Sequence, residues 1–145
     1  MDVRKARPED VETIAALSHL LWQSAGLMEH VDEVGKIISS PDSAIFVACD
    51  GKSLVGFAYC HLRCDYVEGT HASPVGYLEG ILVSPTHRRR GYGLALVGAC
   101  ERWARSCGCT EFASDCELDG KELASFLEAA GFAETNRIIC FAKGI

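Results

Sequence analysis

The N-terminal part of the chain begins with a strand-like alternation and continues with a helical spacing of apolar residues. Residues 2–6 alternate between apolar and polar side chains, as a short strand does. Pro8 is followed by two acidic residues, which is typical of a helix start. The apolar stripe of this helix continues toward Gly26, where we expect it to stop, and a weaker helix follows over 30–39.

The middle of the chain has the two-residue period of strands. Residues 44–62 form two β-rich runs joined at Asp50-Gly51, a dipeptide that favours a tight hairpin turn. A polar loop separates this hairpin from an apolar run over 76–83, which predicts a further strand. The sequence therefore predicts three consecutive strands in this region.

Helical spacing returns after three arginines and two glycines and continues to about Cys107. The remaining predicted elements are a strand over 110–115, a helix over 119–132 that stops at Gly131, and a last strand over 136–143. The order β-α-α-β-β-β-α-β-α-β predicts an α+β, three-layer architecture, in which a mixed sheet is covered by helices on both faces. No repeat or linker interrupts this order, so we expect residues 1–145 to form a single domain.

Charge and hydropathy exclude several classes of partner. The net charge is −6 and the pI is near 5.3, which argues against nucleic-acid binding and favours a cationic substrate. No apolar run is as long as a membrane span. Asp2, Arg4, Lys5 and Arg7 leave no room for the apolar region of a signal peptide. We therefore expect a cytoplasmic protein that does not bind membranes.

Eight cysteines raise the alternatives of disulfides, a metal site or a catalytic thiol. A disulfide framework belongs to short secreted chains, and most of these cysteines lie in apolar runs, where a thiol packs as a small hydrophobic group. The chain has neither paired C-x2-C knuckles nor H-E-x-x-H, so we expect no metal. No histidine is placed by sequence to activate a catalytic cysteine, although that alternative stays open.

The sequence "RRRGYG", residues 88–93, joins a strand directly to a helix and has the chemistry of an anion site. The free N–H groups and the positive dipole end of the helix converge there. Gly91 and Gly93 allow a ligand to approach the backbone, and the three arginines can pair with phosphate oxygens. A solvated arginine-rich helix cap is the alternative.

Two common phosphate motifs do not fit this chain. The "GKS" of residues 51–53 lacks the first glycine of a P-loop, because Phe46 stands at that position. A Rossmann fingerprint would need a third glycine where Leu96 stands, and it would lie near the first strand.

The 88–93 turn matches the Q/R-x-x-G-x-G/A signature of the GCN5-related N-acetyltransferases (GNAT), and the element order resembles that fold along nearly the whole chain. The resemblance implies a splayed pair of parallel strands in the sheet and acetyl-CoA as co-substrate. The turn would hold the diphosphate, and the preceding strand would pair with the pantetheine arm. The residues that the resemblance assigns to the coenzyme are Ile81, Leu82, Val83, Arg88, Arg89, Arg90, Gly91, Tyr92, Gly93 and Leu94.

Acetylation of an amine requires a carboxylate near the acceptor. An alkylammonium with a pKa of about 10.4 is neutral in only about one molecule in 10³ at pH 7, so a base must remove its proton. Glu79 lies in the middle of the strand "YLEGILV", where a charged side chain is costly unless it faces solvent. Asp115 follows the neighbouring strand and could face the same cleft, or it could cap the next turn.

The segments "HLRCDYVEGTHASPVGYLEGILVSP", "ASD" and "MDVR" resemble the aminoglycoside 6′-N-acetyltransferases, a bacterial antibiotic-resistance family. The resemblance implies that an acidic, aromatic-flanked pocket receives the cationic sugar, with Trp22, Tyr66, Glu79 and Asp115 at the matching positions. Trp22 could instead belong to the core. Asn136 stands where related enzymes can place an extra acid. Pairing of C-terminal strands is common in the family, which implies a homodimer.

Two departures from the superfamily pattern limit the prediction. Leu127 replaces a tyrosine that protonates the leaving thiolate in many members, and Asp119 and Gly120 stand where an asparagine is often found. We expect direct transfer in a ternary complex, with a backbone N–H polarising the donor carbonyl. Two alternatives remain: an acetyltransferase for another small amine or a peptide N-terminus, and a catalytically silent CoA-binding regulatory module.

Overall fold

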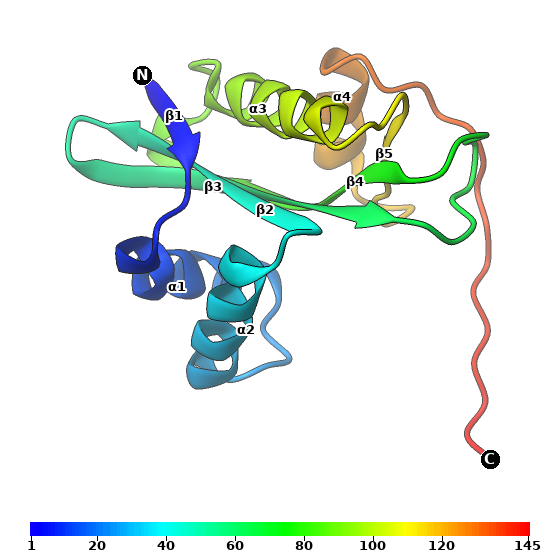
Figure 1. Ribbon diagram of the computed structural model, residues 1–145, viewed down its shortest axis with the longest axis horizontal. Coiled ribbons are helices and arrows are strands. Elements are labelled where there is room, and N and C mark those ends of the chain that lie inside the picture. Colours follow the sequence, from blue (N-terminus) through cyan, green and yellow to red (C-terminus); the bar gives the residue numbers. More distant parts are fainter.

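The computed structural model describes residues 1–145, which form one sheet between two pairs of helices (Figure 1). The elements are β1 (Asp2–Lys5), α1 (Val11–Leu21), α2 (Leu27–Ser39), β2 (Ser43–Asp50), β3 (Ser53–Arg63), β4 (Val75–Val83), α3 (Tyr92–Ser106), β5 (Phe112–Ser114) and α4 (Lys121–Ala129). The five strands are in the order β1-β2-β3-β4-β5, antiparallel except for the parallel pair β4–β5. This confirms the predicted mixed sheet with helices on both faces.

Each face of the sheet has its own hydrophobic core. Leu96 and Cys100 of α3 and Leu127 of α4 are buried against one face. Ile14 of α1 and Val34 of α2 are buried against the other face. In α1 and α3 the apolar side of the helical spacing therefore faces the sheet. None of the helices combines the length and the apolar character that a membrane crossing requires.

β4 contains an extra residue where it pairs with β3. Gly80 is opposite Tyr59, but the next residue of β3 is opposite Leu78, so Glu79 has no direct partner. Leu78 and Ile81 both pack into the core under α3, although regular alternation would turn them to opposite faces. A bulge of this kind re-aims a side chain. As a result, Glu79 and Gly80 are both on the face that α1 and α2 cover.

The predicted end of the first helix is wrong. α1 ends at Leu21, and Gly26 is the N-cap residue of α2 instead of the stop of α1. Gly26 has an extended backbone, and its carbonyl accepts the first hydrogen bond of α2 from the His30 amide. α2 consequently begins at Leu27, one turn earlier than predicted. Trp22 is left in the connection between the two helices.

The predicted last strand is absent. Residues 133–145 form no regular element. They pass the loop that contains Glu68 and Gly69, which Thr135 and Asn136 contact, and then run as an extended arm away from the body (Figure 1). Gly131 does end α4 as predicted: its φ is +97°, and the Phe132 amide donates to the Leu127 carbonyl. A strand needs a neighbouring edge for its backbone hydrogen bonds, and the arm lies along none. Its large apolar side chains are therefore exposed, Phe141 by 91%.

Candidate active site

The sheet opens where β4 and β5 separate. These strands pair only over Gly76–Leu78 and Phe112–Ser114, while β4 continues to Val83. The Ser114 hydroxyl donates to the Leu78 carbonyl at 2.9 Å, at the last pair before the fork. One edge of the segment 81–83 therefore has no strand beside it, and its backbone can pair with an extended ligand.

The fork faces the 88–93 turn, which begins α3 with a set of unpaired amides. The first α-helical hydrogen bond runs from the Ala95 amide to the Gly91 carbonyl, so the amides of residues 92–94 have no acceptor in the helix. Gly91 has a φ of +84°, and Arg89 is at +60°, a region in which non-glycine residues are uncommon. The turn therefore presents backbone donors, together with the helix dipole, to an anion.

The arginines of the turn are exposed. Arg88 Nε donates to the Val83 carbonyl at 3.2 Å, and its Nη1 is 3.3 Å from Glu122. Arg89 and Arg90 make no ion pair or hydrogen bond with their side chains. Two cationic groups at the helix start are consequently available to a ligand.

Two residues of the turn also contribute to the packing of the protein. The Tyr92 side chain is buried in the core under α3, so only its amide faces the turn. A Cβ on Gly93 would lie 2.8 Å from Phe126 of α4. Gly93 is thus required for the packing of α3 against α4, whereas Gly91 is required for its positive φ.

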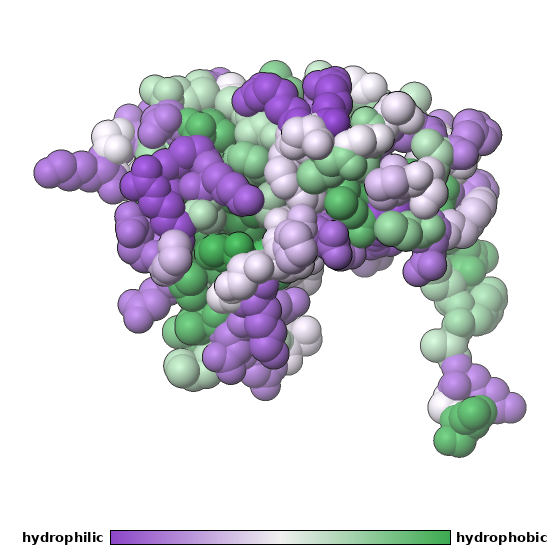
Figure 2. Space-filling model, viewed as in Figure 1, coloured by the Kyte–Doolittle hydropathy of each residue, from purple (hydrophilic) through white to green (hydrophobic).

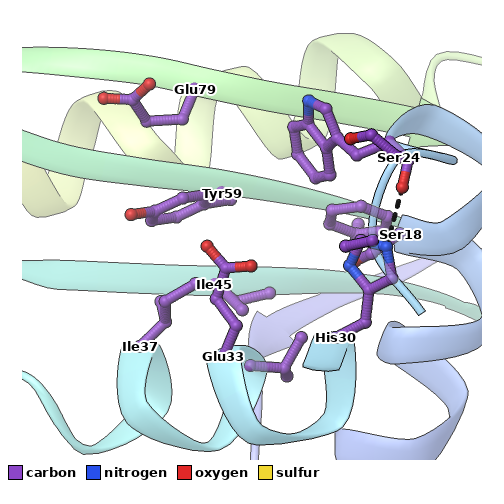
Figure 3. Close-up of a pocket in the computed structure, with 12 residues that line it drawn as sticks. Ser18, Ser24, His30, Glu33, Ile37, Ile45, Tyr59 and Glu79 are labelled. Atoms are coloured by element: carbon purple, nitrogen blue, oxygen red, sulfur yellow. Dashed lines mark hydrogen bonds between the residues drawn. The ribbon is translucent and has the colours of Figure 1, made fainter. Parts of the chain in front are cut away.

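A cavity of about 480 Å³ lies between the α1–α2 pair and the sheet (Figure 3). Glu79 and Trp22, both predicted from the sequence, line it together. The sequence analysis missed Glu33 of α2 and Tyr59 of β3, which also line it. Figure 3 shows Tyr59 between the carboxylates of Glu79 and Glu33. The cavity therefore has two anionic groups and an aromatic wall, which is suited to a cation.

Tyr59 stands in this cavity as a neutral phenol. Burial raises the pKa of its hydroxyl, and the carboxylates of Glu79 and Glu33 raise it further, whereas a hydrogen bond with Ser43 acts in the opposite direction. The hydroxyl can consequently donate a hydrogen bond at neutral pH, in addition to the contact area of its ring.

Trp22 is held by two contacts. The ring Nε2 of buried His30 donates to the Trp22 carbonyl at 2.8 Å. The indole lies directly against Gly80, where an added Cβ would be 2.6 Å from its Cζ2 atom. The bulge in β4 thus provides both the carboxylate of Glu79 and the flat surface for the indole.

Asp115 lies next to Tyr77. Burial raises the pKa of the Tyr77 hydroxyl, and the Asp115 carboxylate raises it further. Asp115 does not line the cavity of Trp22 and Glu79. Arg63 binds the Glu79 carboxylate and stacks on the Tyr77 ring.

Tyr66 and Asn136 both bind Glu68, outside the cavity. The Tyr66 hydroxyl donates to Glu68 at 2.7 Å, and Asn136 Nδ2 donates to Glu68 at 3.0 Å. These two hydrogen bonds, first that from Asn136, lower the pKa of the Glu68 carboxyl. Glu68 was not predicted, because its two partners come from segments far apart in the sequence.

Leu127 and Cys100 have structural roles in this molecule. Leu127 is buried beneath α4 and provides no acid. Burial and the adjacent Cys60 thiol raise the pKa of Cys100, chiefly through the contact with Cys60, so this thiol is inert. No group of three or more potential ligands lies close enough together to hold a metal ion.

Comparisons with known proteins agree with this geometry. Residues 11–132 match the model of the acetyltransferase (GNAT) family. The aminoglycoside N(6′)-acetyltransferase type 1 of Stenotrophomonas maltophilia is 40% identical over 141 residues, which cover 96% of this chain and 90% of the relative. That of Klebsiella aerogenes is 40% identical over 146 residues, 97% of this chain and 95% of the relative.

Solved structures with the same fold are also similar over their full length. Aminoglycoside acetyltransferase AAC(6′)-Iy, in complex with the bisubstrate analogue CoA-S-monomethyl-acetylneamine, has a TM-score of 0.95 and 34% identity, covering 99% of this chain and 98% of that chain. The apo structure of AAC(6′)-IG from Acinetobacter haemolyticus has a TM-score of 0.94 and 33% identity, covering 100% of this chain and 99% of that chain.

Proposed function

This chain belongs to the acetyltransferase (GNAT) family, and we propose that it transfers the acetyl group of acetyl-CoA to the 6′-amino group of aminoglycoside antibiotics, conferring resistance. The relatives that carry this activity in their names match it over nearly its full length. The observation that carries the proposal is the cavity lined by Glu79, Glu33 and Trp22 close to the open edge of β4. A polycationic sugar fits such a cavity better than a neutral or anionic acceptor does. We further propose that residues 1–145 act as one domain.

The coenzyme site that we propose is built mainly from backbone. The amides of the 88–93 turn and of Leu94 would bind the diphosphate, with Arg89 and Arg90 adding charge. The open edge of Ile81–Val83 would pair with the pantetheine arm as an added strand does. The unpaired amides and the positive φ of Gly91 support this assignment.

Glu79 is our candidate for binding and deprotonating the acceptor amine. The amine nitrogen attacks the thioester carbonyl carbon, its proton passes to the Glu79 carboxylate, and the C–S bond breaks to release the coenzyme thiolate. A backbone N–H at the opening of β4 would stabilise the developing oxyanion. With Leu127 in place of an acid, the thiolate leaves without a dedicated proton donor. A thiol pKa of about 8.5 makes such a leaving group tolerable near neutral pH.

The other predicted contacts surround this centre. Trp22 would cover one side of the sugar ring, and Glu33 would bind a second ammonium group in the cavity. Asp115, beside Tyr77, would assist Glu79 from the β5 side. Tyr66 and Asn136, held together through Glu68, would contact the part of the antibiotic that extends beyond the cavity.

We also propose that the protein is a cytoplasmic homodimer. The arm 133–145 exposes Ile138, Ile139 and Phe141. Figure 2 shows that much of the surface of this arm is apolar where it stands away from the body of the molecule. An extended apolar segment of this kind is stabilised by pairing with a sheet edge of a second chain. The free thiols fit a reducing compartment, which also supplies acetyl-CoA.

Thiol release from acetyl-CoA in the presence of kanamycin, compared with spermidine, tests the assignment. We expect kcat/KM for kanamycin to exceed that for spermidine by at least about tenfold. One additional hydrogen-bonded ion pair in the cavity changes kcat/KM by about that factor. Equal or faster turnover of spermidine would reject the aminoglycoside assignment. Tight acetyl-CoA binding with no turnover of any amine would instead identify a regulatory module.

Substitution tests the role of Glu79. Glu79→Gln should lower kcat by about 10² to 10⁴, the range of general base catalysis. Glu128→Gln is the matched control, because it removes a carboxylate from the exposed surface of α4 and should leave kcat unchanged. Full activity of Glu79→Gln would remove Glu79 from the mechanism.

A further inference from the structure

The carboxylate of Glu79 is bound by a cation of the protein itself. Arg63 Nε and Nη2 donate to Oε1 at 3.0 and 2.8 Å, and Nη2 also donates to Oε2 at 3.0 Å. The side chains are only partly exposed, 39% for Arg63 and 23% for Glu79. The residue that we assign to the acceptor amine therefore shares its charge with a guanidinium before any substrate arrives.

Arg63 is fixed in this position from a second side. It is the last residue of β3, and its guanidinium carbon lies 3.5 Å from the centre of the Tyr77 ring. Tyr77 is itself buried, on β4 between β3 and β5. A guanidinium that stacks on an aromatic ring and binds a carboxylate through two nitrogens has little freedom to leave.

The geometry leaves one acceptor position on Glu79. A carboxylate offers about four lone-pair directions. Arg63 uses two of them on Oε1 and one on Oε2. The remaining direction on Oε2 is available to an amine N–H, so the acceptor can bind Glu79 while Arg63 stays in place.

Charge sharing has a consequence for the chemistry. The acceptor reacts only as a neutral amine, and a lone, half-buried carboxylate would stabilise the unreactive ammonium as an ion pair. Tighter binding of the ground state raises the barrier from that state. We propose that Arg63 is a positioning residue for the acceptor: it orients Glu79 and reduces the stabilisation of the bound ammonium. As a result, the acceptor binds more weakly and turns over faster. This inference rests on the proposed role of Glu79.

The KM and kcat of Arg63→Gln, assayed with kanamycin and acetyl-CoA, distinguish a positioning role of Arg63 from a loss of structure. We expect the KM for kanamycin to fall about fivefold, which corresponds to an exposed ion-pair energy of about 1 kcal/mol, while kcat falls about tenfold. Arg63→Lys keeps the charge but not the two-nitrogen contact, so its KM should stay within about twofold of the wild type while its kcat is intermediate. Arg105→Gln removes a cation from the solvent-facing side of α3 and serves as the control that should change neither constant.

The same Arg63→Gln substitution in a Glu79→Gln background separates this inference from the proposed function. If Arg63 acts through Glu79, the Arg63→Gln substitution should change KM and kcat by less than about twofold in the Glu79→Gln background. Equal effects in both backgrounds, or a KM that rises in Arg63→Gln, would overturn the inference while the activity assignment stands. Loss of the kanamycin preference, or full activity of Glu79→Gln, would instead overturn the proposed function. If Arg63→Gln does not fold, as judged by thermal melting, the KM of Arg63→Lys decides: an increase above about fivefold would contradict charge sharing.

Discussion

Replacing Gly80 by alanine would place a methyl group against the indole of Trp22, in the wall of the cavity that Glu79 also lines. The new Cβ would lie 2.6 Å from Cζ2 of the indole. Carbon atoms are in favourable contact at about 3.5 to 4.0 Å, so the ring must move by about 1 Å. Trp22 is 39% exposed and can move outward, away from the sheet.

The effect should fall on acceptor binding more than on stability. Overpacking in a closed core costs about 1 to 3 kcal/mol, and a ring with open space beside it should be near the lower end. Displacement of a positioning side chain by about 1 Å can reduce the rate as much as about 10²-fold. We expect the KM for kanamycin to rise about tenfold, while the KM for acetyl-CoA stays unchanged because the 88–93 turn is not involved.

Steady-state kinetics with each substrate varied in turn, together with thermal melting, measures these effects. Gly35→Ala is the matched control, because no atom lies within 4 Å of the added Cβ in the middle of α2. That control should keep both KM values and gain up to about 1 kcal/mol of stability. An unchanged KM for kanamycin in a folded Gly80→Ala protein, or an equal rise for both substrates, would refute the placement of Trp22 in the acceptor site.

Three further predictions concern other parts of the molecule. Gly91→Ala should raise the KM for acetyl-CoA about tenfold and leave that for kanamycin unchanged, because a φ of +84° costs a non-glycine residue about 1 to 2 kcal/mol; equal changes in both would contradict the diphosphate site. Hydrogen bonds from Arg4, at 2.7 and 2.9 Å, lower the pKa of Asp10, so this pair stabilises the fold above the unfolded-state pKa of about 3.9 and the stabilisation is lost as the pH falls below it. Asp10→Asn should therefore lower the melting temperature more at pH 7 than near pH 2, and an equal loss at both would contradict the assignment. Removal of residues 134–145 should give a monomer in sedimentation velocity, and a persistent dimer would show that the arm is not the interface.

The parts of the site that follow from local backbone chemistry could be predicted from the sequence. Gly131 ends α4 with a positive φ, as a glycine at a helix stop does, and the turn at Asp50-Gly51 joins β2 to β3 as expected. Glu79 was singled out because a charge in an apolar strand is costly unless it has a partner or a function. Such inferences need only the neighbouring residues, so they do not depend on how distant elements meet.

Features that depend on register and on pairing over a distance could not be predicted. The ion pair of Arg63 with Glu79 depends on the alignment of β3 with β4, including the extra residue. Glu33 contributes to the cavity because of the way α2 crosses the sheet, which its own amphipathic pattern does not specify. Residues 136–143 have the composition of a strand, but composition does not identify the edge with which a strand pairs.

The bulge in β4 separates what the core requires of this strand from what the cavity requires of it. Upstream of the bulge Leu78 faces α3, and downstream Ile81 does so again, only because one position has been absorbed between them. Deletion of either Glu79 or Gly80 would return the strand to regular alternation, in which Leu78 and Ile81 still face α3 and still pair with β3. The cavity, however, would lose either its carboxylate or the close contact with the indole of Trp22. The extra residue is therefore a requirement of the site and not of the core.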